Sequence, residues 1–379
     1  MTGRLKSGVR ALPAPLRFLR ALLGRDRPAY IHYAVTTKCN LQCRMCEIWK
    51  REAKDELGLD QIEELAAVLA EVGCVQVSLG GGEPAMREDL AEIVEILLAH
   101  GLKPRVLTNG VAMTPSVTDR LLAKGLTEVS FSLDSLNRER QERVDGVSGT
   151  FDKRIKNLIY LAESLPRRSS LPILNTVVTP ENLGDLLEIA DVAADIGFHA
   201  SFIPIHLPPD DHGEHRFFGH APDWRFGEHS EKDLREVFDL LIERKRRGAP
   251  IINSTSFLEQ SVNYLVDGKA SWSCRAGELF HSISPQGQVA PCHAFENVWE
   301  TDFRDLPDLI GTASYLKAVR QRVAECEGCF RPCWAEVSFM MLEARALREM
   351  IKIQARSRFS GRTIDAAAVL RRVEARDSA

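Results

Sequence analysis

The amino-acid sequence predicts an α/β fold, because strand-like and helix-like segments alternate from residue 30 to about residue 247. Six short apolar runs have the length and composition of buried strands. Amphipathic stretches with helical periodicity separate these runs. This alternation is typical of a parallel sheet whose strands are joined by right-handed helical crossovers. Periodicity alone leaves open whether the sheet is an open one or a barrel.

The expected elements follow one another in a regular order. The strand-like runs are Ile31–Thr36, Val75–Leu79, Arg105–Leu107, Val129–Leu133, Ile173–Val178 and Ala200–Ile205. The helical stretches are Ile62–Val72, Leu90–Ala99, Val117–Lys124, Ile155–Leu165, Leu183–Ile196 and Glu231–Arg246. Active sites of parallel α/β folds lie at the carboxyl ends of the strands, so the polar residues that follow the strands are the candidate functional residues.

The composition is that of an ordinary soluble protein. The 379 residues suffice for one large domain and a small one, and 44% of them are hydrophobic and 27% charged. A net charge of −4 gives no case for nucleic-acid binding. No apolar run approaches the roughly 18 residues of a membrane span, and no signal-peptide pattern opens the chain. Because the nine cysteines are clustered without a secretion signal, we expect metal ligands and a reducing cytoplasmic compartment.

Three cysteines with the spacing C-x3-C-x2-C follow the first strand-like run. They are Cys39, Cys43 and Cys46, and the next cysteine, Cys74, lies in an apolar stretch where it is expected to be inert core. Three neighbouring thiolates suit a [4Fe–4S] cluster and leave one iron open for a non-protein ligand. A zinc knuckle is the alternative, but zinc would require a fourth Cys or His close by.

Polar residues at the ends of the next strands are expected to meet at the same edge of the sheet. The second strand ends in Gly80-Gly81-Gly82-Glu83-Pro84, where glycines let the backbone approach a ligand and Glu83 can accept from an ammonium group. The alternative for this stretch is a tight strand-to-helix turn. The later candidates are Thr108, Asn109, Ser132, Asp134 and Asn175, of which Ser132 and Asp134 are also good helix caps.

The cysteine spacing resembles the signature C-x3-C-x-aromatic-C of the radical S-adenosylmethionine (radical SAM) enzymes, with Met45 in the place of the aromatic residue. The resemblance implies a partial (β/α)6 TIM-like barrel that is open on one side. It also implies that SAM binds the open iron. An electron from the cluster, supplied by a reductant such as flavodoxin or ferredoxin, then cleaves SAM to methionine and a 5′-deoxyadenosyl radical.

The same resemblance extends to the residues at the strand ends. Gly80-Gly81-Gly82-Glu83-Pro84 is similar to the GGEP motif that binds the SAM amino group, which implies this role for Gly81, Gly82 and Glu83. Thr108-Asn109-Gly110 resembles the TNG element that lines the SAM pocket. The family also implies that Ser132 and Asp134 bind the ribose hydroxyls, and Asn175 is a further candidate SAM contact.

A second group of cysteines lies near the carboxyl end of the chain. Phe280–Ala290 reads as a β-hairpin that turns at Pro285-Gln286-Gly287. This region resembles the twitch/SPASM extensions of radical SAM enzymes, small α+β domains that carry auxiliary iron–sulfur clusters. Five cysteines can complete one [4Fe–4S] cluster, with one cysteine spare, and a zinc site is the alternative. The five are Cys274, Cys292, Cys326, Cys329 and Cys333.

The predicted organisation has four parts: a basic amphipathic segment at 1–28, a radical SAM core at 29–248, an auxiliary-cluster domain at 249–340 and a basic helical tail at 341–379. Residues 1–28 carry seven Lys or Arg against one acid, so they could lie on an anionic membrane; a helix that covers the main domain is the simpler interpretation. The proline-rich stretch Leu207–Ser230, with four histidines, is interpreted as a substrate lid, and a zinc site with irregular spacing is the alternative.

The resulting functional hypothesis is a radical SAM oxidoreductase that removes a hydrogen from an unactivated carbon, with an auxiliary cluster that accepts an electron. The resemblance gives a peptide side chain or a sugar-like alcohol as the substrate class. The alternatives are a redox-neutral epimerase and an enzyme that modifies a lipid or a carrier. A non-catalytic electron carrier is the other class, but a carrier needs neither an open iron nor the GGEP and TNG elements.

Overall fold

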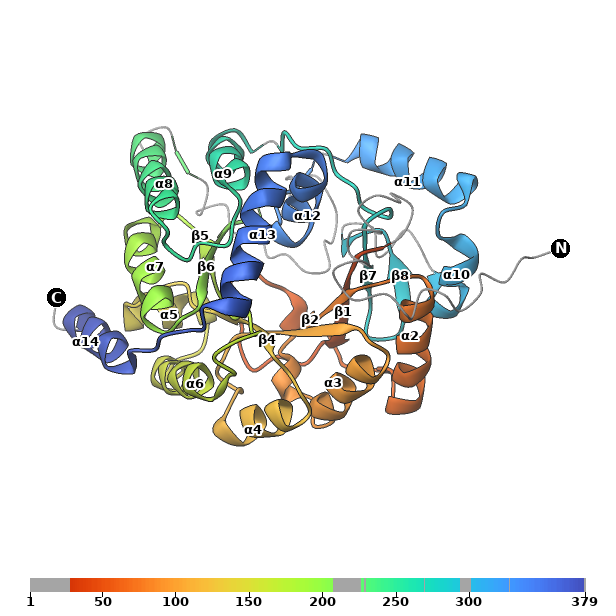
Figure 1. The fold of residues 1–379 in the computed structure, drawn as a ribbon, viewed down its shortest axis with the longest axis horizontal. Coiled ribbons are helices and arrows are strands. Elements are labelled where there is room, and N and C mark those ends of the chain that lie inside the picture. Colours follow the sequence, from red (N-terminus) through yellow and green to blue (C-terminus); the bar gives the residue numbers. More distant parts are fainter. Residues whose placement is uncertain are drawn as a thin grey trace.

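A nine-stranded sheet organises the computed structural model, which describes residues 28–206, 226–227, 230–268, 270–293, 301–326 and 328–377. The strands lie in the order β6-β5-β4-β3-β2-β1-β7-β8-β9 (Figure 1). They are β1 (Tyr30–Thr36), β2 (Gln76–Gly81), β3 (Lys103–Thr108), β4 (Glu128–Ser132), β5 (Ile173–Val178), β6 (His199–Pro204), β7 (Phe280–Ile283), β8 (Gln288–Ala290) and β9 (Thr301–Asp302).

Strands β1 to β6 are parallel and neighbour one another in chain order, as the alternation of elements predicts. Each has a helical connection to the next, which is the arrangement of a (β/α) barrel. In the described part of the chain β6 and β9 are the two edges of the sheet, each with one neighbouring strand. The barrel is therefore open between these two edges. The fold is therefore the partial TIM-like barrel that was expected.

The helices follow the predicted order, with an additional one at Arg138–Asp145 and others in the second half of the chain. Short 3-10 helices are η1 (Ile48–Lys50), η2 (Pro84–Met86), η3 (Leu183–Asp185) and η7 (Phe303–Asp305). The α-helices are α2 (Leu59–Glu71), α3 (Leu90–Ala99), α4 (Pro115–Ala123), α5 (Arg138–Asp145), α6 (Phe151–Ser164), α7 (Leu186–Asp195), α8 (Glu231–Arg246), α9 (Thr255–Asp267), α10 (Leu306–Leu309), α11 (Ala313–Glu325), α12 (Pro332–Leu342), α13 (Ala344–Phe359) and α14 (Ala366–Asp377).

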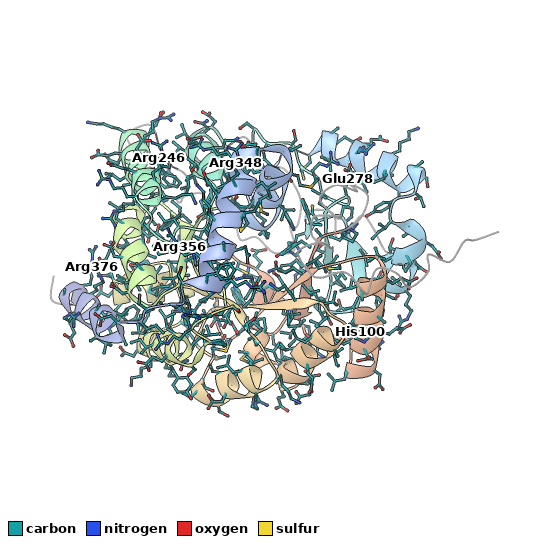
Figure 2. All side chains as sticks on the ribbon, in the orientation of Figure 1. His100, Arg246, Glu278, Arg348, Arg356 and Arg376 are labelled. Atoms are coloured by element: carbon teal, nitrogen blue, oxygen red, sulfur yellow. The ribbon has the colours of Figure 1, made fainter. Side chains whose placement is uncertain are left out.

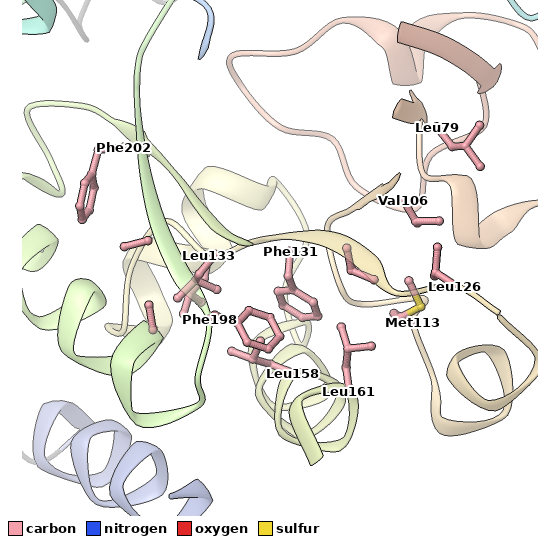
Figure 3. Packing of buried hydrophobic residues seen from close by; sticks show 14 of the residues in the cluster. Leu79, Val106, Met113, Leu126, Phe131, Leu133, Leu158, Leu161, Phe198 and Phe202 are labelled. Carbon is pink, nitrogen blue, oxygen red and sulfur yellow. The ribbon is translucent and has the colours of Figure 1, made fainter. Parts of the chain in front are cut away.

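The main hydrophobic core lies between the sheet and the outer helices (Figure 3). Alternate residues of each strand point to this side. Leu79, Val106 and Phe131 come from β2, β3 and β4, and they pack in the same cluster as Leu158 and Leu161 of α6. All five side chains are buried. The apolar stripe of each helix thus covers the apolar face of the sheet.

The opposite face of the sheet, inside the barrel, is polar. It carries His32 of β1, Ser78 of β2 and, near the amino ends of the strands, the buried ion pair of Arg105 and Glu128. The Arg105 Nη2 and Glu128 Oε2 atoms are 2.5 Å apart, and Lys103 Nζ lies 3.2 Å from the other carboxylate oxygen. A polar interior is what a barrel needs if polar molecules are to bind there.

The carboxyl-terminal third of the chain is joined to the sheet by the predicted hairpin. Strands β7 and β8 are antiparallel, with Ser282 opposite Ala290, which confirms the hairpin at Phe280–Ala290. Strand β7 also pairs with β1 in parallel, so the cysteine-rich region lies beside the first strand of the barrel. The division of the chain at residue 248 remains a prediction, and the hairpin beyond it belongs to the same sheet.

Two predictions fall outside the described residues. One is the helix expected within residues 1–28, of which only residue 28 is described, and the other is the lid with His212, His215, His220 and His229. The tail is helical as expected and forms α13 and α14. None of the helices described is both long enough and apolar enough to cross a membrane.

Candidate active site

The cysteine loop, residues 37–46, leaves the carboxyl end of β1 and ends just before η1. Glu56 fixes its start, because Glu56 Oε1 accepts a hydrogen bond of 2.7 Å from the hydroxyl of Thr36. The backbone N–H of Cys46 donates to the carbonyl of Cys43 at 3.1 Å, so these two cysteines share one turn. All three thiols of the loop are partly buried at the end of the strand, where the sequence predicts them.

The glycine loop after β2 packs directly against the cysteine loop. The backbone N–H of Gly82 donates to Thr36 O and that of Glu83 to Lys38 O, both at 2.8 Å. A Cβ atom on Gly82 would lie 2.0 Å from Lys38 O, and one on Gly81, whose φ is +108°, would lie 2.3 Å from Thr36 O. The close approach of the cysteine-loop backbone therefore requires these glycines. The sequence alone indicates a different reason for them, the close approach of a ligand.

Glu83 is almost completely buried and ties the glycine loop to the loop after β3. Its Oε1 accepts hydrogen bonds from the backbone N–H of Ala85 (3.0 Å) and from the hydroxyl of Thr108 (2.8 Å). Its Oε2 accepts one from the backbone N–H of Asn109 (2.7 Å). Burial raises the pKa of the carboxyl, and these hydrogen bonds oppose the increase by favouring the charged form.

Asn109 connects the loop after β3 to the cysteine loop. Its Nδ2 donates to the side-chain oxygen of Asn40 at 2.8 Å and lies 4.0 Å from the Cys39 sulfur. Its Oδ1 accepts from the backbone N–H of Val111 at 2.9 Å, which fixes the orientation of the amide. The sequence predicts Thr108 and Asn109 at this site, and the structure brings both beside Glu83 and the first cysteine.

Ser132 and Asn175 lie side by side in the register of β4 and β5, and Asn175 pairs in turn with Ser201 of β6. Alternation along the strands puts all three on the inner face of the barrel. Ser132 and Asn175 are half-buried. With Ser201 they form a polar row across β4, β5 and β6. Strands β2 and β3 separate this row from β1, which leads into the cysteine loop.

Asp134 lies just beyond β4 and is buried. Its Oδ1 accepts a hydrogen bond of 2.7 Å from the backbone N–H of Val177, which holds the ends of β4 and β5 together. Burial raises the pKa of this carboxyl to about 6. Asp134 is not a helix cap, because the side chain of Asn137 caps α5. The hydrogen bond to Val177 gives Asp134 a structural role that the sequence does not indicate.

The thiols of the cysteine loop suit an iron–sulfur cluster. Burial raises the pKa of Cys39 to about 11 and also raises the pKa of Cys43 and Cys46. Iron favours the thiolate form, so ligation would offset this effect. Among the described residues no three His, Cys, Asp or Glu side chains are close enough to share a single metal ion. A cubane does not require such an arrangement, because each thiolate binds a different iron.

The five cysteines of the carboxyl-terminal region lie close together. Cys274, Cys292, Cys329 and Cys333 all belong to one small apolar cluster with Phe280 and Trp334. Cys326 is exposed at the end of α11, and it adds to the increase in the pKa of Cys274 that burial causes. A donor set of five sulfurs suits a four-thiolate cluster with one cysteine to spare. In contrast, Cys74 is fully buried in the main core, as expected.

The charge of Arg331 acts on cysteines of both groups. Arg331 precedes α12, and its guanidinium carbon is 5.6 Å from the ring centre of Trp334. Burial raises the pKa of Cys46 and of Cys333, and the positive charge of Arg331 opposes the increase at both thiols. One guanidinium can act on both only if the two groups face the same region of the protein, because charge interactions weaken with distance.

Three side chains near the site were not identified from the sequence. Arg154 and Asp145 form a buried bidentate ion pair with N–O distances of 2.8 and 2.9 Å. Arg154 Nε also donates to Asn109 O, and Asp145 O accepts from the backbone N–H of Gln42 in the cysteine loop. The pair therefore supports two of the loops of the site. Arg331 was missed as well, although its position between Cys329 and Cys333 was a usable signal.

Comparison with known proteins agrees with this geometry. Residues 33–193 match the model of the Radical SAM superfamily. The chain is 29% identical over 304 residues to the mycofactocin maturase MftC of Mycolicibacterium smegmatis, which covers 75% of this chain and 73% of that protein. It is 25% identical to the PqqA peptide cyclase of Granulibacter bethesdensis over 71% of this chain and 68% of that one.

A solved structure shares the fold. SuiB of Streptococcus suis, bound to its precursor peptide SuiA, superposes with a TM-score of 0.59 at 19% identity, over 84% of this chain and 73% of SuiB. The match of residues 33–193 contains the cysteine loop, the glycine loop and the Asn109 loop. Residues 33–193 therefore form a Radical SAM domain, the family whose enzymes use a [4Fe–4S] cluster and SAM.

Proposed function

We propose that the protein is a radical SAM oxidoreductase that oxidises or remodels a peptide side chain with the help of an auxiliary iron–sulfur cluster. The observation that carries the proposal is that the second group of cysteines packs beside β1, the strand that leads into the cysteine loop. A substrate between the two groups would be within reach of radical chemistry on one side and of an electron acceptor on the other.

The assignment of the first cluster rests on the cysteine loop. Cys39, Cys43 and Cys46 would hold three irons, and the fourth iron would bind the amino and carboxylate groups of SAM. A bound cluster of this kind supplies the electron that cleaves SAM to methionine and the 5′-deoxyadenosyl radical, which takes a hydrogen atom from the substrate. The residues of the chain contribute by holding SAM and the loops in a fixed geometry.

Glu83 is suited to the ammonium group of SAM. Its Oε2 accepts one hydrogen bond, from Asn109, and an ionised carboxylate oxygen can accept a second. Gly81 and Gly82 would present backbone groups beside it, and Thr108 and Asn109 would complete that wall. On the inner face of the barrel Ser132 and Asn175 would bind the ribose. The Oδ1 atom of Asp134 accepts from the backbone N–H of Val177, so Asp134 would bind the ribose through its other carboxylate oxygen.

The second group of cysteines would hold one further [4Fe–4S] cluster. After hydrogen abstraction, the substrate radical would give one electron to this cluster and lose a proton, which completes a two-electron oxidation. The location of the five cysteines beside β1 supports electron transfer across the inside of the barrel. A redox-neutral epimerase, in which the spare cysteine returns a hydrogen atom, remains the alternative reaction.

A peptide substrate is supported by the relatives. MftC is named a maturase, the PqqA enzyme is named a peptide cyclase, and SuiB has been solved with a precursor peptide. The reductant would be a flavodoxin or a ferredoxin, as in the superfamily generally. Sugar-like and lipid-linked substrates are the alternatives that the assay must include.

The test uses full-length protein reconstituted with iron and sulfide under anaerobic conditions. It should bind about eight irons per chain, as two [4Fe–4S] clusters require, and should form 5′-deoxyadenosine from SAM and dithionite. Changing Cys39, Cys43 and Cys46 together to Ala should remove about half of the iron and all of the 5′-deoxyadenosine. SAM cleavage by the triple variant would refute the assignment of the cysteine loop.

The substrate class is tested separately. Deuterated peptides, sugars and lipid-linked alcohols are offered to the active enzyme, and the 5′-deoxyadenosine that forms is analysed by mass spectrometry. Deuterium transfer from a peptide supports the proposal. Transfer only from a sugar or a lipid would contradict the peptide assignment and leave the radical chemistry unaffected.

A further inference from the structure

Helix α13 has two different faces. Ala346 is buried against the rest of the protein, and Glu349 on the inner side accepts hydrogen bonds from Thr255. The opposite side is exposed and carries Ile351 and Phe359, which retain 58% and 72% of their accessible surface. Spacings of three to four residues put Arg348, Ile351, Lys352, Ala355 and Phe359 on this outer side. The outer side is therefore both apolar and basic.

Basic side chains from other segments lie next to the end of α13. Arg356 Nη1 donates to Gly248 O at 3.2 Å, which brings the end of α8 with Arg246 and Arg247 alongside. The backbone N–H of Arg362 donates to Arg167 O at 2.8 Å, which brings the loop after α6 alongside. Figure 2 shows Arg246, Arg348 and Arg356 on the same side of the molecule. We call this surface the α13 face; it consists of Arg167, Arg168, Arg246, Arg247, Arg348, Ile351, Lys352, Ala355, Arg356, Arg358 and Phe359.

The α13 face is positively charged although the whole chain has a net charge of −4. Arg348, Lys352 and Arg358 have no acidic partner among the described residues. Glu349, the acid within α13, is engaged on the inner side of the helix. Next to the face, burial and then the charge of Arg167 lower the pKa of Arg362 to about 10, as expected where positive charges crowd together.

The basic end of this face lies at the opposite end of the barrel from the cysteine loop. Ser357 Oγ donates to Ser170 O, three residues before β5 begins, and Gly248 lies three residues before Ile251, which pairs with Ala200 of β6. These contacts place the end of α13 where the parallel strands begin. The cysteine loop lies where they end.

The chain enters β1 at this same end of the barrel, since all six strands run in the same direction. The residues before β1 are strongly basic. Residues 1–27 carry seven Lys or Arg against one acid, with apolar residues between them. The end of the α13 face thus lies where the chain enters β1, remote from the candidate active site.

We propose that the α13 face docks on a membrane surface that contains anionic phospholipids. Phe and Ile side chains flanked by Lys and Arg are the composition of interfacial membrane contacts. The large exposed fractions of Ile351 and Phe359 mean that they protrude, which suits a planar, deformable lipid surface better than a peptide that needs a groove.

The proposal is tested by co-sedimentation of the full-length protein with vesicles. One set contains phosphatidylcholine and phosphatidylglycerol, and the other contains phosphatidylcholine alone, both at an ionic strength of about 0.15 M. Binding is expected to the anionic vesicles and not to the neutral ones. Each Lys or Arg near such a surface contributes about fivefold in affinity, so Lys352→Gln with Arg358→Gln should weaken the partition about thirtyfold.

Two further variants distinguish membrane docking from simple charge attraction. Ile351→Ser with Phe359→Ser keeps every charge and should weaken partition about tenfold or more, because apolar burial in the interface is lost. The matched control, Lys153→Gln with Lys156→Gln, removes two exposed charges from α6, outside the α13 face, and should bind like the parent protein. Formation of 5′-deoxyadenosine verifies that each variant is folded.

Three results would overturn the proposal. The first is equal binding of the parent protein to neutral and anionic vesicles, or binding to neither. The second is an equal loss of affinity in the α6 control, which would mean a nonspecific effect of net charge. The third is a loss in the charge variant with no loss in the apolar variant, which would indicate simple charge attraction to the vesicles in place of docking by the α13 face.

Discussion

Replacing Glu83 by Gln tests the central contact of the candidate active site. Glu83 accepts three hydrogen bonds, from Ala85 N, Thr108 Oγ1 and Asn109 N. A Gln side chain has the same shape but only one accepting oxygen. Whichever way its amide is oriented, one backbone N–H group then faces an NH2 group and is left without an acceptor.

The structure gives the expected magnitudes. One buried N–H without an acceptor costs about 1–3 kcal/mol of folding stability. Loss of the negative charge should cost a further ~1.5–3 kcal/mol of SAM binding, which is about a ten- to hundredfold increase in Kd. Iron content should be unchanged, because the cysteine loop keeps its thiols.

The assay combines calorimetric SAM titration, iron analysis and thermal unfolding of the reconstituted protein. Thr108→Val is the matched control, since it removes one hydrogen bond to Glu83 and keeps the charge. It should lower stability by about 1 kcal/mol with a much smaller change in SAM affinity. If both variants bind SAM equally weakly, Glu83 acts only by supporting the loop. Unchanged affinity in Glu83→Gln would refute any contact between its charge and SAM.

Three further predictions concern the surroundings of this contact. Cys292→Ala combined with Cys329→Ala should lower the iron content by about half and still form 5′-deoxyadenosine, but it should yield little oxidised product; normal product yield would contradict an electron-accepting cluster. Asp134 has a folded-state pKa of about 6, above its value of about 3.9 in the unfolded chain. Its charged form therefore destabilises the protein above pH 6, and this penalty disappears as the pH falls below about 4. Asp134→Asn should therefore raise the unfolding free energy at pH 8 by about 2–3 kcal/mol and leave it unchanged near pH 4, as measured by denaturant titration. Arg154→Met should cost about 3–5 kcal/mol because it leaves Asp145 charged and buried, and a loss below 1 kcal/mol would show that the ion pair does not support the loops.

The alternation of strands and helices could be predicted from the sequence because the apolar residues are strictly periodic there. Strand β5 was expected at Ile173–Val178 and helix α3 at Leu90–Ala99, and both have these bounds in the structure. Helix α5 was missed, because Arg138–Asp145 is almost entirely polar and has no apolar periodicity. Its position depends on Gln141, whose side chain accepts hydrogen bonds from two backbone N–H groups near the end of β4.

The candidate site was predictable where it consists of short motifs and unpredictable where it consists of distant contacts. The spacing of Cys39, Cys43 and Cys46 identifies a thiol loop without knowledge of the fold. The hydrogen bond between Asn40 and Asn109, in contrast, joins residues 69 positions apart, and no local pattern marks it. The glycine loop lies between these cases, since the motif was recognised and the physical reason for its glycines was not.

The contacts of Gly81, Gly82 and Glu83 change how mutations in this loop should be interpreted. Gly82 lies so close to Lys38 O that any side chain would displace the cysteine loop. A Gly82→Ala variant would therefore lose the first cluster and SAM binding together, even if Gly82 never touches SAM. Glu83→Gln can change SAM affinity without loss of iron, because its side chain fits the same space. Only the second pattern, normal iron with weak SAM binding, identifies a residue that contacts SAM, and iron content must accompany every affinity measured at this site.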